Sequence, residues 1–327
     1  MLTNELPKHD KIVTTLAADS RVPDILSGSG TRMAVDYSLH SASLGSLSGP
    51  GTLPGLSDDQ VAQFWSQGYL AGVPVLSQDD CDKLLEDIET FRGGDHPGHS
   101  YLYEFHANQT GDPDRVLMHS LGHWRLTKGF HDLMYLPSIT KAASKLLQPN
   151  QTASVRFWHD QLFVKPPKTG SVVAWHQDYS YWTRSVPMQH LTVHVALDDQ
   201  DESNGCIHYI PGSHRWTRND GGPLPVVDFD FKDPELFKTI LTEEEKKQFC
   251  PVPIKLRRGE AVFHHPLAVH GSRENKSDRW RRAAVLNYMA DGTRSDSDKP
   301  LLEGVPAVPR GEVIQGRFFP LVLDTEH

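Results

Sequence analysis

The sequence is short of several features that would place it in a specialised class of protein. It has only 3 cysteines, Cys81, Cys206 and Cys250, and no two of them form a C-x-x-C pair. This usage supports neither a disulfide framework nor a cysteine zinc site, and it is typical of a reducing compartment. No apolar run approaches the roughly 18 residues that cross a bilayer, so no membrane association is expected. The N-terminal residues contain no apolar signal segment, which favours a cytoplasmic protein.

Positive charge is also scarce. The chain has 33 Lys and Arg residues against 42 Asp and Glu residues, which leaves a net charge of −9. Because nucleic-acid binding relies on an excess of positive charge, DNA and RNA are not expected partners. The charged fraction of 23% and the hydrophobic fraction of 38% are those of an ordinary globular protein. The sequence leaves the oligomeric state open.

The first part of the chain is predicted to differ from the rest. Residues 1–56 are expected to form a flexible arm, because 27–57 are rich in Ser and Gly and poor in large apolar side chains. Residues 57–327 are expected to form a single domain. Its first helices are predicted to begin after Ser57 and Ser77, where capping signals precede apolar residues at helical spacing.

A third helical stretch, 128–147, is interrupted at Pro137, after which Ser138 is predicted to cap a new start. Short alternating runs then follow. They give eight candidate strands, at 155–157, 161–164, 172–175, 191–197, 206–210, 254–256, 261–264 and 283–288. This spacing predicts an all-β core with flanking helices, arranged as a double-stranded β-helix, or jelly roll of the cupin kind. The acidic stretch at about 220–251 is interpreted as an insertion that ends in a helix over 242–249.

The segment Ala174-Trp-His-Gln-Asp-Tyr-Ser contains the one His-x-Asp of the chain. On an extended strand, side chains two residues apart share a face, so His176 and Asp178 can bind one metal ion. Chance is a serious alternative, because 18 histidines and 42 acidic residues would produce about two such pairs in a chain of this length. A second cluster at the end of an apolar strand, His264 to His270, offers His270 as a third ligand.

Two imidazoles and one carboxylate on one side of an octahedron leave three adjacent positions open, which is typical of Fe(II) oxygenases. Zinc more often completes a tetrahedron. Arg281 follows His270 by eleven residues on the next predicted strand. There it can bind a dicarboxylate cosubstrate through two hydrogen bonds. Without the histidines, it would as readily be a solvated arginine beside Arg279 and Arg282.

Four motifs follow one another in the chain. They are Lys165-Pro-Pro before His176-Gln-Asp178, then His194-Val-Ala-Leu-Asp-Asp, then Asn204-Gly-Cys-Ile-His-Tyr-Ile-Pro-Gly-Ser-His214, and finally His270-Gly-Ser272 followed by Arg281. In this order they resemble the phytanoyl-CoA dioxygenase-like Fe(II)- and 2-oxoglutarate-dependent oxygenases, over about residues 57–290. The resemblance implies Fe(II), 2-oxoglutarate and O2 as cofactor and cosubstrates, and succinate and CO2 as products.

The resemblance also implies roles for single residues. His176, Asp178 and His270 match the iron ligands, and Arg281 matches the residue that binds the distal carboxylate of 2-oxoglutarate. Three further positions match cosubstrate contacts: Ser272, where a hydroxyl assists the arginine; Gln161, on a strand; and His194, where relatives often carry an aromatic residue or Thr.

Other residues near these motifs are open to two interpretations. Tyr179, Tyr181 and Trp182 follow Asp178 directly and are interpreted as a substrate wall, although aromatic residues after a strand also pack into cores. His208 either lines the pocket or pairs with its neighbours. His264 and His265 precede Pro266 and are interpreted as hydrogen-bonded groups at a strand end rather than as ligands.

The expected function is hydroxylation, or another oxidation, of a small organic metabolite. An acyl-CoA hydroxylase is an alternative, and it would need a basic groove for the CoA phosphates, which Arg257-Arg258 and 279–282 could supply. A non-catalytic metal-binding jelly roll that acts as an interaction protein is a second alternative, but loss of a ligand or of Arg281 would then be expected. A zinc hydrolase would need a nearby general base and no dicarboxylate anchor.

Overall fold

The computed structural model describes residues 34–52, 54–218, 221–226 and 234–325. The larger of its two main sheets contains β1 (Tyr69–Pro74), β2 (Glu104–His106), β3 (Met118–Leu121), β4 (Val155–Lys165), β7 (His190–Ala196), β10 (Glu260–His264), β12 (Arg281–Ala290) and β14 (Leu321–Leu323). The smaller sheet contains β5 (Val173–His176), β8 (Ile207–Tyr209), β9 (Val252–Pro253) and β11 (His270–Ser272).

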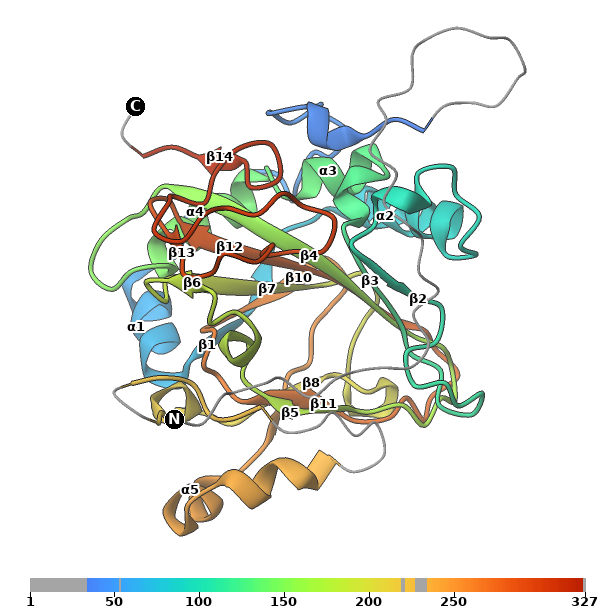
Figure 1. Cartoon of the computed structure of the whole chain (residues 1–327). Helices are drawn as coiled ribbons and strands as arrows, with labels where there is room; N and C mark the ends of the chain where they lie inside the picture. The colour runs from blue at the N-terminus through green and yellow to red at the C-terminus, as the bar shows by residue number, and fades with distance from the viewer. Residues whose placement is uncertain (1–33, 53, 219–220, 227–233, 326–327) are drawn as a thin grey trace, which may run out of the picture. The chain divides into compact units, whose positions relative to one another are not determined.

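The two sheets face each other and are antiparallel throughout (Figure 1). The strand order is β1-β10-β7-β12-β4-β3-β2 in the larger sheet, with β14 beside β4, and β5-β11-β8-β9 in the smaller sheet. The short strands β6 (Ser185–Val186) and β13 (Arg294–Ser295) form a separate pair. The architecture is the predicted jelly roll.

The structure corrects several predicted strands. The runs 155–157 and 161–164 belong to one continuous strand, β4. No strand is assigned to 254–256, where the backbone makes only isolated bonds, from Ile254 to Ile207 and between Leu256 and Gln200. Eight described strands were not predicted: β1, β2, β3, β6, β9, β11, β13 and β14. In β1 the reason is local, since Gly72 at a positive φ of 76° forms an irregularity in its pairing with β10, and glycine normally argues against a strand.

Four helices precede β4. They are α1 (Asp58–Gln67), α2 (Gln78–Phe91), α3 (Lys128–Leu133) and α4 (Pro137–Leu146). Ser57 and Ser77 form the expected capping boxes at α1 and α2. The prediction for Ser138 is wrong, because α4 already begins at Pro137, which fits the first helical position without needing an N–H. The Ser138 hydroxyl instead donates a hydrogen bond to the carbonyl of Val75 (2.8 Å).

The helices cover one face of the larger sheet. Side chains from β7, β10 and β12 join those of α1, α2, α3 and α4 in one buried apolar cluster. Leu191, Val193 and Val195 of β7 belong to this cluster, whereas Thr192 and His194 line a pocket on the opposite face. The two-residue period of the strands therefore separates an apolar helix face from a polar face directed at the smaller sheet.

Part of the segment that was expected to be a flexible arm is fixed to this helical layer. The buried carboxylate of Asp132 accepts hydrogen bonds from the backbone N–H groups of Leu44 (2.7 Å) and Ser46 (2.6 Å). Asp80, also buried, accepts from the N–H groups of Ser48 and Gly49 (both 2.9 Å). The expectation is therefore wrong for residues 44–49, while residues 1–33 lie outside the described part of the chain.

The acidic insertion is described in part, without residues 219–220 and 227–233. Its predicted helix is present as α5 (Glu243–Gln248), with Thr242 as N-cap. Apolar residues on both sides of α5, Leu241 and Phe249, pack with Trp175 of β5. Figure 1 shows α5 beyond the smaller sheet, on the side away from the larger one. None of the described helices is long and apolar enough to span a membrane.

Candidate active site

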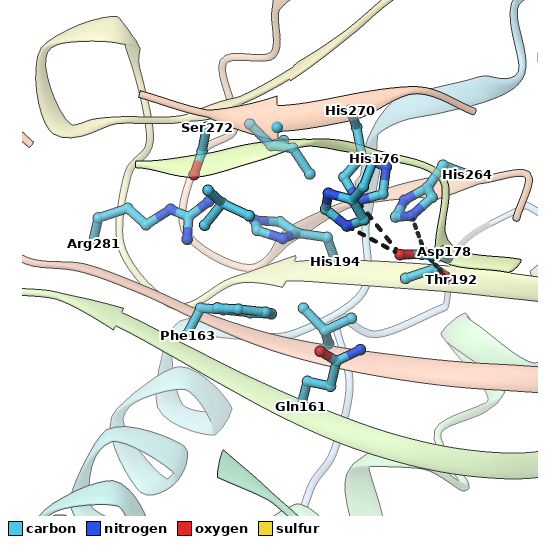
Figure 2. A pocket seen from close by; sticks show the side chains of 14 residues that line it. Gln161, Phe163, His176, Asp178, Thr192, His194, His264, His270, Ser272 and Arg281 are labelled. Carbon is cyan, nitrogen blue, oxygen red and sulfur yellow. Dashed lines mark hydrogen bonds and ion pairs between the residues drawn. The ribbon is translucent and has the colours of Figure 1, made fainter. Parts of the chain in front are cut away.

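Three side chains of the ligand type meet between the two sheets. His176 ends β5, Asp178 follows two residues later, and His270 begins β11, where it is the cross-strand partner of His176. Figure 2 shows the carboxylate lying below the two imidazoles. Asp178 Oδ1 is 3.4 Å from Nε2 of His176 and 3.6 Å from Nε2 of His270. One ligand atom from each residue lies within 4.8 Å of the other two, so the three could hold a single metal ion.

Backbone carbonyls fix the orientation of both imidazoles. Nδ1 of His176 lies 2.8 Å from the carbonyl oxygen of Ala174, and Nδ1 of His270 lies 3.0 Å from that of Ala268. A carbonyl oxygen only accepts, so each Nδ1 carries a proton, and Nε2 is the ring nitrogen directed at Asp178. Metal-bound histidines are commonly oriented in this way.

Asp178 is held from its other side. Its Oδ2 accepts hydrogen bonds from the Thr192 hydroxyl (2.7 Å) and from Nε2 of His264 (2.9 Å), which leaves Oδ1 directed at the two histidines. Burial alone would raise the pKa of Asp178, but His270, His176 and His264 hold it well below its ordinary value. The carboxylate is therefore ionised and suits one metal–oxygen bond.

His264 has a second partner. Its Nδ1 lies 2.8 Å from the hydroxyl of the buried Tyr209, which donates to it because Nε2 carries the proton. The sequence interpretation of His264 as a hydrogen-bonded group at a strand end is confirmed, but it missed that the bonded partner is Asp178. The two-residue period of β10 was the available signal, since it places His264 on the pocket face.

Two buried basic residues lie near the opposite end of the pocket: Arg281 lines it, and Lys165 contacts Ser272, which also lines it. Arg281 is 2% exposed and Lys165 is 0% exposed, and they are cross-strand partners on β12 and β4. Neither forms an ion pair with a carboxylate among the described residues, and Nε of Arg281 is buried without a hydrogen-bond partner. Burial lowers the pKa of Arg281 to about 10, and burial followed by the charge of Arg281 lowers the pKa of Lys165.

The strand register places Arg281 and its neighbour Arg282 on opposite faces of β12. Arg282 points to the other face of β12, where its guanidinium donates to both oxygens of Asp198 (2.9 and 2.7 Å). Arg281 instead lines the pocket, beside Ser272 (Figure 2). The arginine without a carboxylate partner is therefore the one that faces the triad.

The cavity between the triad and Arg281 has a volume of about 50 Å³. Gln161 and His194, the predicted cosubstrate contacts, both line it. His194 Nε2 is hydrogen-bonded to Oε1 of Gln200 (3.0 Å), and burial lowers the pKa of His194 to about 3, so it adds no third cation. Apolar side chains complete the walls, among them Phe163, Val173, Ile207 and Val285.

The predicted substrate residues are placed differently from one another. Tyr179 and Trp182 pack into a buried apolar cluster, and the Tyr179 hydroxyl donates to the carbonyl of Ser185. Tyr181 is 42% exposed, with its ring centroid 6.0 Å from that of His176. His208 lies between two residues of β8 that face the site, so its side chain points to the other face, toward Trp175. Only Tyr181 thus remains in position to contact a substrate beside the triad.

Three comparisons relate the chain to known proteins. A family model described as phytanoyl-CoA dioxygenase (PhyH) matches residues 64–283. The chain is 24% identical over 296 residues to phytanoyl-CoA dioxygenase domain-containing protein 1 of Danio rerio, covering 78% of this chain and 97% of that relative.

Two solved structures support the fold. One is the non-heme alpha ketoglutarate dependent carbocyclase SnoK from nogalamycin biosynthesis, with a TM-score of 0.64 and 23% identity over 84% of this chain and 99% of SnoK. The other is the epimerase SnoN in complex with Fe3+, alpha ketoglutarate and nogalamycin RO, with a TM-score of 0.64 and 20% identity over 81% and 98% of the two chains.

Proposed function

Because the chain belongs to the phytanoyl-CoA dioxygenase family, and is thereby an Fe(II)- and 2-oxoglutarate-dependent dioxygenase, we propose that it oxidises a small organic metabolite that is not a CoA thioester. The outcome is hydroxylation or a related oxidation, with release of succinate and CO2. One observation carries the proposal: a single pocket has a triad of metal-ligand type at one end and the unpaired, buried Arg281 at the other.

The donor set fits Fe(II). Nε2 of His176, Oδ1 of Asp178 and Nε2 of His270 would hold the metal, since all three atoms converge and each residue is oriented by a hydrogen bond on its far side. When bound, Fe(II) supplies O2 activation, coupled to conversion of 2-oxoglutarate into succinate and CO2. The carboxylate of Asp178 occupies the third ligand position and contributes negative charge there.

The protein's own groups bind and orient the cosubstrate. Arg281 would pair with its distal carboxylate through two parallel hydrogen bonds, and Ser272 lies beside this guanidinium. Phe163 and Val285 cover the space between this end and the triad and keep water from it. Because Arg281 lies at the end of the pocket away from the triad, the pocket favours a molecule that carries a carboxylate at its far end.

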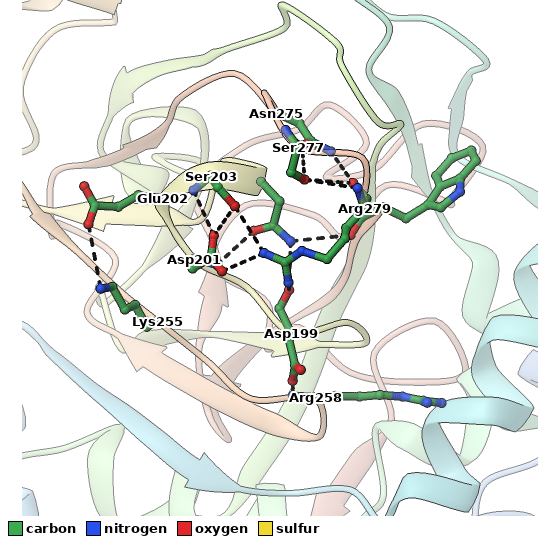
Figure 3. Close-up of polar contacts among 11 residues, drawn as sticks. Asp199, Asp201, Glu202, Ser203, Lys255, Arg258, Asn275, Ser277 and Arg279 are labelled. Carbon is green, nitrogen blue, oxygen red and sulfur yellow. Dashed lines mark hydrogen bonds and ion pairs between the residues drawn. The ribbon is translucent and has the colours of Figure 1, made fainter.

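The surface arginines argue against an acyl-CoA substrate. Arg279 is paired with Asp201 (2.6 Å), as Figure 3 shows, and Arg258 is paired with Asp82. Arg257 is paired with Glu260 (2.9 Å) and Arg282 with Asp198. These four arginines of the suggested basic groove are therefore already paired with carboxylates, and the fifth, Arg281, faces the pocket instead.

The same surface also carries acidic residues. Hydrogen bonds from Ser203 and from Arg279 lower the pKa of Asp201 to about 2, so this group stays ionised at neutral pH. Glu202 and Asp199 lie beside it in Figure 3. A phosphate group would meet negative charge here, which supports a substrate without the CoA moiety.

The first experiment tests the triad. Metal-free protein should bind one Fe(II) per chain, and 2-oxoglutarate added without O2 should then produce the weak visible absorption band of the chelate. His270→Ala should abolish both signals because it removes a ligand. His106→Ala is the control, since His106 pairs with the half-exposed Glu104 outside the pocket. Full iron stoichiometry in His270→Ala would contradict the ligand assignment.

The second experiment searches for the substrate. Succinate formation is measured while metabolite extracts and acyl-CoA thioesters are supplied side by side, and any stimulating compound is examined for a gain of one oxygen atom. Stimulation by CoA esters alone would contradict the proposed substrate class. Iron and 2-oxoglutarate binding without succinate formation under any condition would favour the non-catalytic alternative.

A further inference from the structure

Lys165 is an unusual residue for the interior of a protein. Its side chain is 0% exposed, and its Nζ donates to three acceptors: the carbonyl of Ser171 (3.1 Å), the Ser272 hydroxyl oxygen (2.9 Å) and the carbonyl of Arg273 (2.6 Å). These three acceptors match the three N–H bonds of an ammonium group, so the geometry fits the protonated amine with all of its donors used. None of its partners carries a negative charge.

The hydrogen bond from Lys165 restricts the direction of the Ser272 hydroxyl proton. Since Lys165 can only donate, the Ser272 oxygen is the acceptor, and its own O–H bond must point elsewhere. Ser272 is 6% exposed, lines the pocket, and donates to no acceptor within the described residues. Its proton is therefore available to an acceptor inside the pocket, beside Arg281.

The charge around this end of the pocket is also unbalanced. Lys165 and Arg281 are neighbours on adjacent strands, and both are buried. The acidic side chains whose charge acts on these two residues are already paired with other cations, Glu274 with Lys276 and Asp198 with Arg282. Buried charges are normally paired, so this end is complete only when an anion enters.

We propose that Lys165 is a positioning residue that makes Ser272 a hydrogen-bond donor to the distal carboxylate of the cosubstrate. Together with Arg281, it selects 2-oxo acids that carry a second carboxylate over those that do not. The inference rests on the proposed function, because it takes 2-oxoglutarate as the occupant of the pocket. Lys165 itself does not contact the cosubstrate, since its three donors are used by the protein.

The test compares two ligands on the Fe(II)-loaded protein without O2. One is 2-oxoglutarate, and the other is 2-oxobutyrate, which has the chelating end but lacks the distal carboxylate. In Lys165→Met, the Kd of 2-oxoglutarate should rise about 10- to 100-fold, the range for loss of a hydrogen bond to a charged group. The Kd of 2-oxobutyrate should change by less than about threefold, because that ligand does not reach Ser272.

A double-mutant cycle isolates the coupling through Ser272. Ser272→Ala should weaken 2-oxoglutarate binding by itself, and adding Lys165→Met should then cost less than it does in the wild type, because the oriented hydroxyl is already absent. If Lys165→Met does not fold, Lys165→Gln allows the same comparison without the charge. Thermal unfolding of each variant checks that the fold is retained.

The outcomes separate this inference from the proposed function. Failure of the wild type to bind 2-oxoglutarate would contradict the proposed function. Normal binding by the wild type together with equal weakening of both ligands in Lys165→Met would show that Lys165 only maintains the shape of the pocket, and would overturn the inference. Unchanged 2-oxoglutarate binding, or strictly additive effects in the cycle, would overturn it as well.

Discussion

The two faces of the larger sheet use the same strands for different purposes. On the helix face, apolar residues such as Val193 and Leu286 are buried in one cluster with the helices. On the pocket face, Thr192 donates a hydrogen bond to Asp178, and Arg281 has no ion-pair partner within the described part of the chain. Polar groups on the helix side, such as Asp132, have their hydrogen bonds made by the protein itself. Folding stability and ligand binding should therefore be separable by substitutions one residue apart.

The largest difference between the effect on ligand binding and the effect on folding stability is expected at Arg281. Arg281→Ala should weaken 2-oxoglutarate binding by about 2–5 kcal/mol, the usual cost of removing one partner of a desolvated charge pair. Iron binding should persist, and the ligand-free protein should not lose stability, because a buried cation without a partner is removed. Titration of 2-oxoglutarate and thermal unfolding measure the two effects. Arg282→Ala is the matched control on the other face, and a binding defect of equal size there would show that the strand register is wrong.

The opposite result, a loss of stability without a loss of ligand affinity, is expected at Leu286, which is 1% exposed on the helix face. Leu286→Ala should lower the free energy of unfolding by about 2–5 kcal/mol, because it leaves a cavity in the core. At a temperature where the variant is folded, its affinities for Fe(II) and 2-oxoglutarate should equal those of the wild type. Chemical denaturation measures the unfolding free energy, and ligand titration measures the affinities. A clear loss of ligand affinity would mean that the two faces are coupled.

Deletion of residues 1–50 extends the comparison to the outer side of the helices. It removes the N–H groups of residues 44–49 that donate to Asp80 and Asp132, so the unfolding free energy should fall by roughly 2–4 kcal/mol at neutral pH. Burial alone would raise the pKa of both carboxyls, but these hydrogen bonds lower it. Depressed carboxyl pKa values stabilise the fold above their unfolded value of about 4 and cease to do so as the pH falls through the folded value.

The deletion variant should therefore lose less stability than the full chain on acidification below pH about 4, as unfolding measured across pH would show. Asp132→Asn in the full chain is the matched control, because it removes one charge and keeps the segment. An unchanged unfolding free energy in the deletion variant would show that these contacts contribute nothing to stability. The segment would then behave as the flexible arm that its composition predicted.

The smallest effect is expected at His264, which touches the triad without belonging to it. His264→Phe removes one of two donors to Asp178 Oδ2, and such changes usually weaken metal binding about 10- to 100-fold. Competition with a chelator measures the Fe(II) affinity. Tyr209→Phe, one hydrogen bond further from the triad, should have a smaller effect in the same direction. An affinity equal to that of the wild type would show that Thr192 alone suffices to hold the carboxylate.

Sequence reasoning could identify the triad because its signal is local. His176 and Asp178 are two residues apart on one strand, and a single further histidine completes the set. Lys165 was visible only as part of a motif, since lysines are rarely buried and nothing in the sequence shows that β4 and β12 are neighbours. The partnership of His264 with Asp178 joins residues 86 positions apart and depends on the same kind of pairing.

Composition misled the prediction in the N-terminal segment. Ser- and Gly-rich sequence usually lacks side chains to bury, but residues 44–49 are held through their backbone N–H groups, which composition does not reveal. The helix caps at Ser57 and Ser77 were predictable for the opposite reason, since their hydrogen bonds lie within four consecutive residues. Hydrogen bonds between residues close in the sequence could thus be inferred, whereas hydrogen bonds that depend on tertiary contact could not.

A crystal structure with Fe(II) and N-oxalylglycine, a 2-oxoglutarate analogue, prepared without O2, tests the central claim most directly. The account predicts an anomalous iron peak within bonding distance of Nε2 of His176, Oδ1 of Asp178 and Nε2 of His270. It also predicts that the distal carboxylate of the analogue lies between Arg281 and the Ser272 hydroxyl. Iron bound elsewhere, or a distal carboxylate directed away from Arg281, would contradict the account.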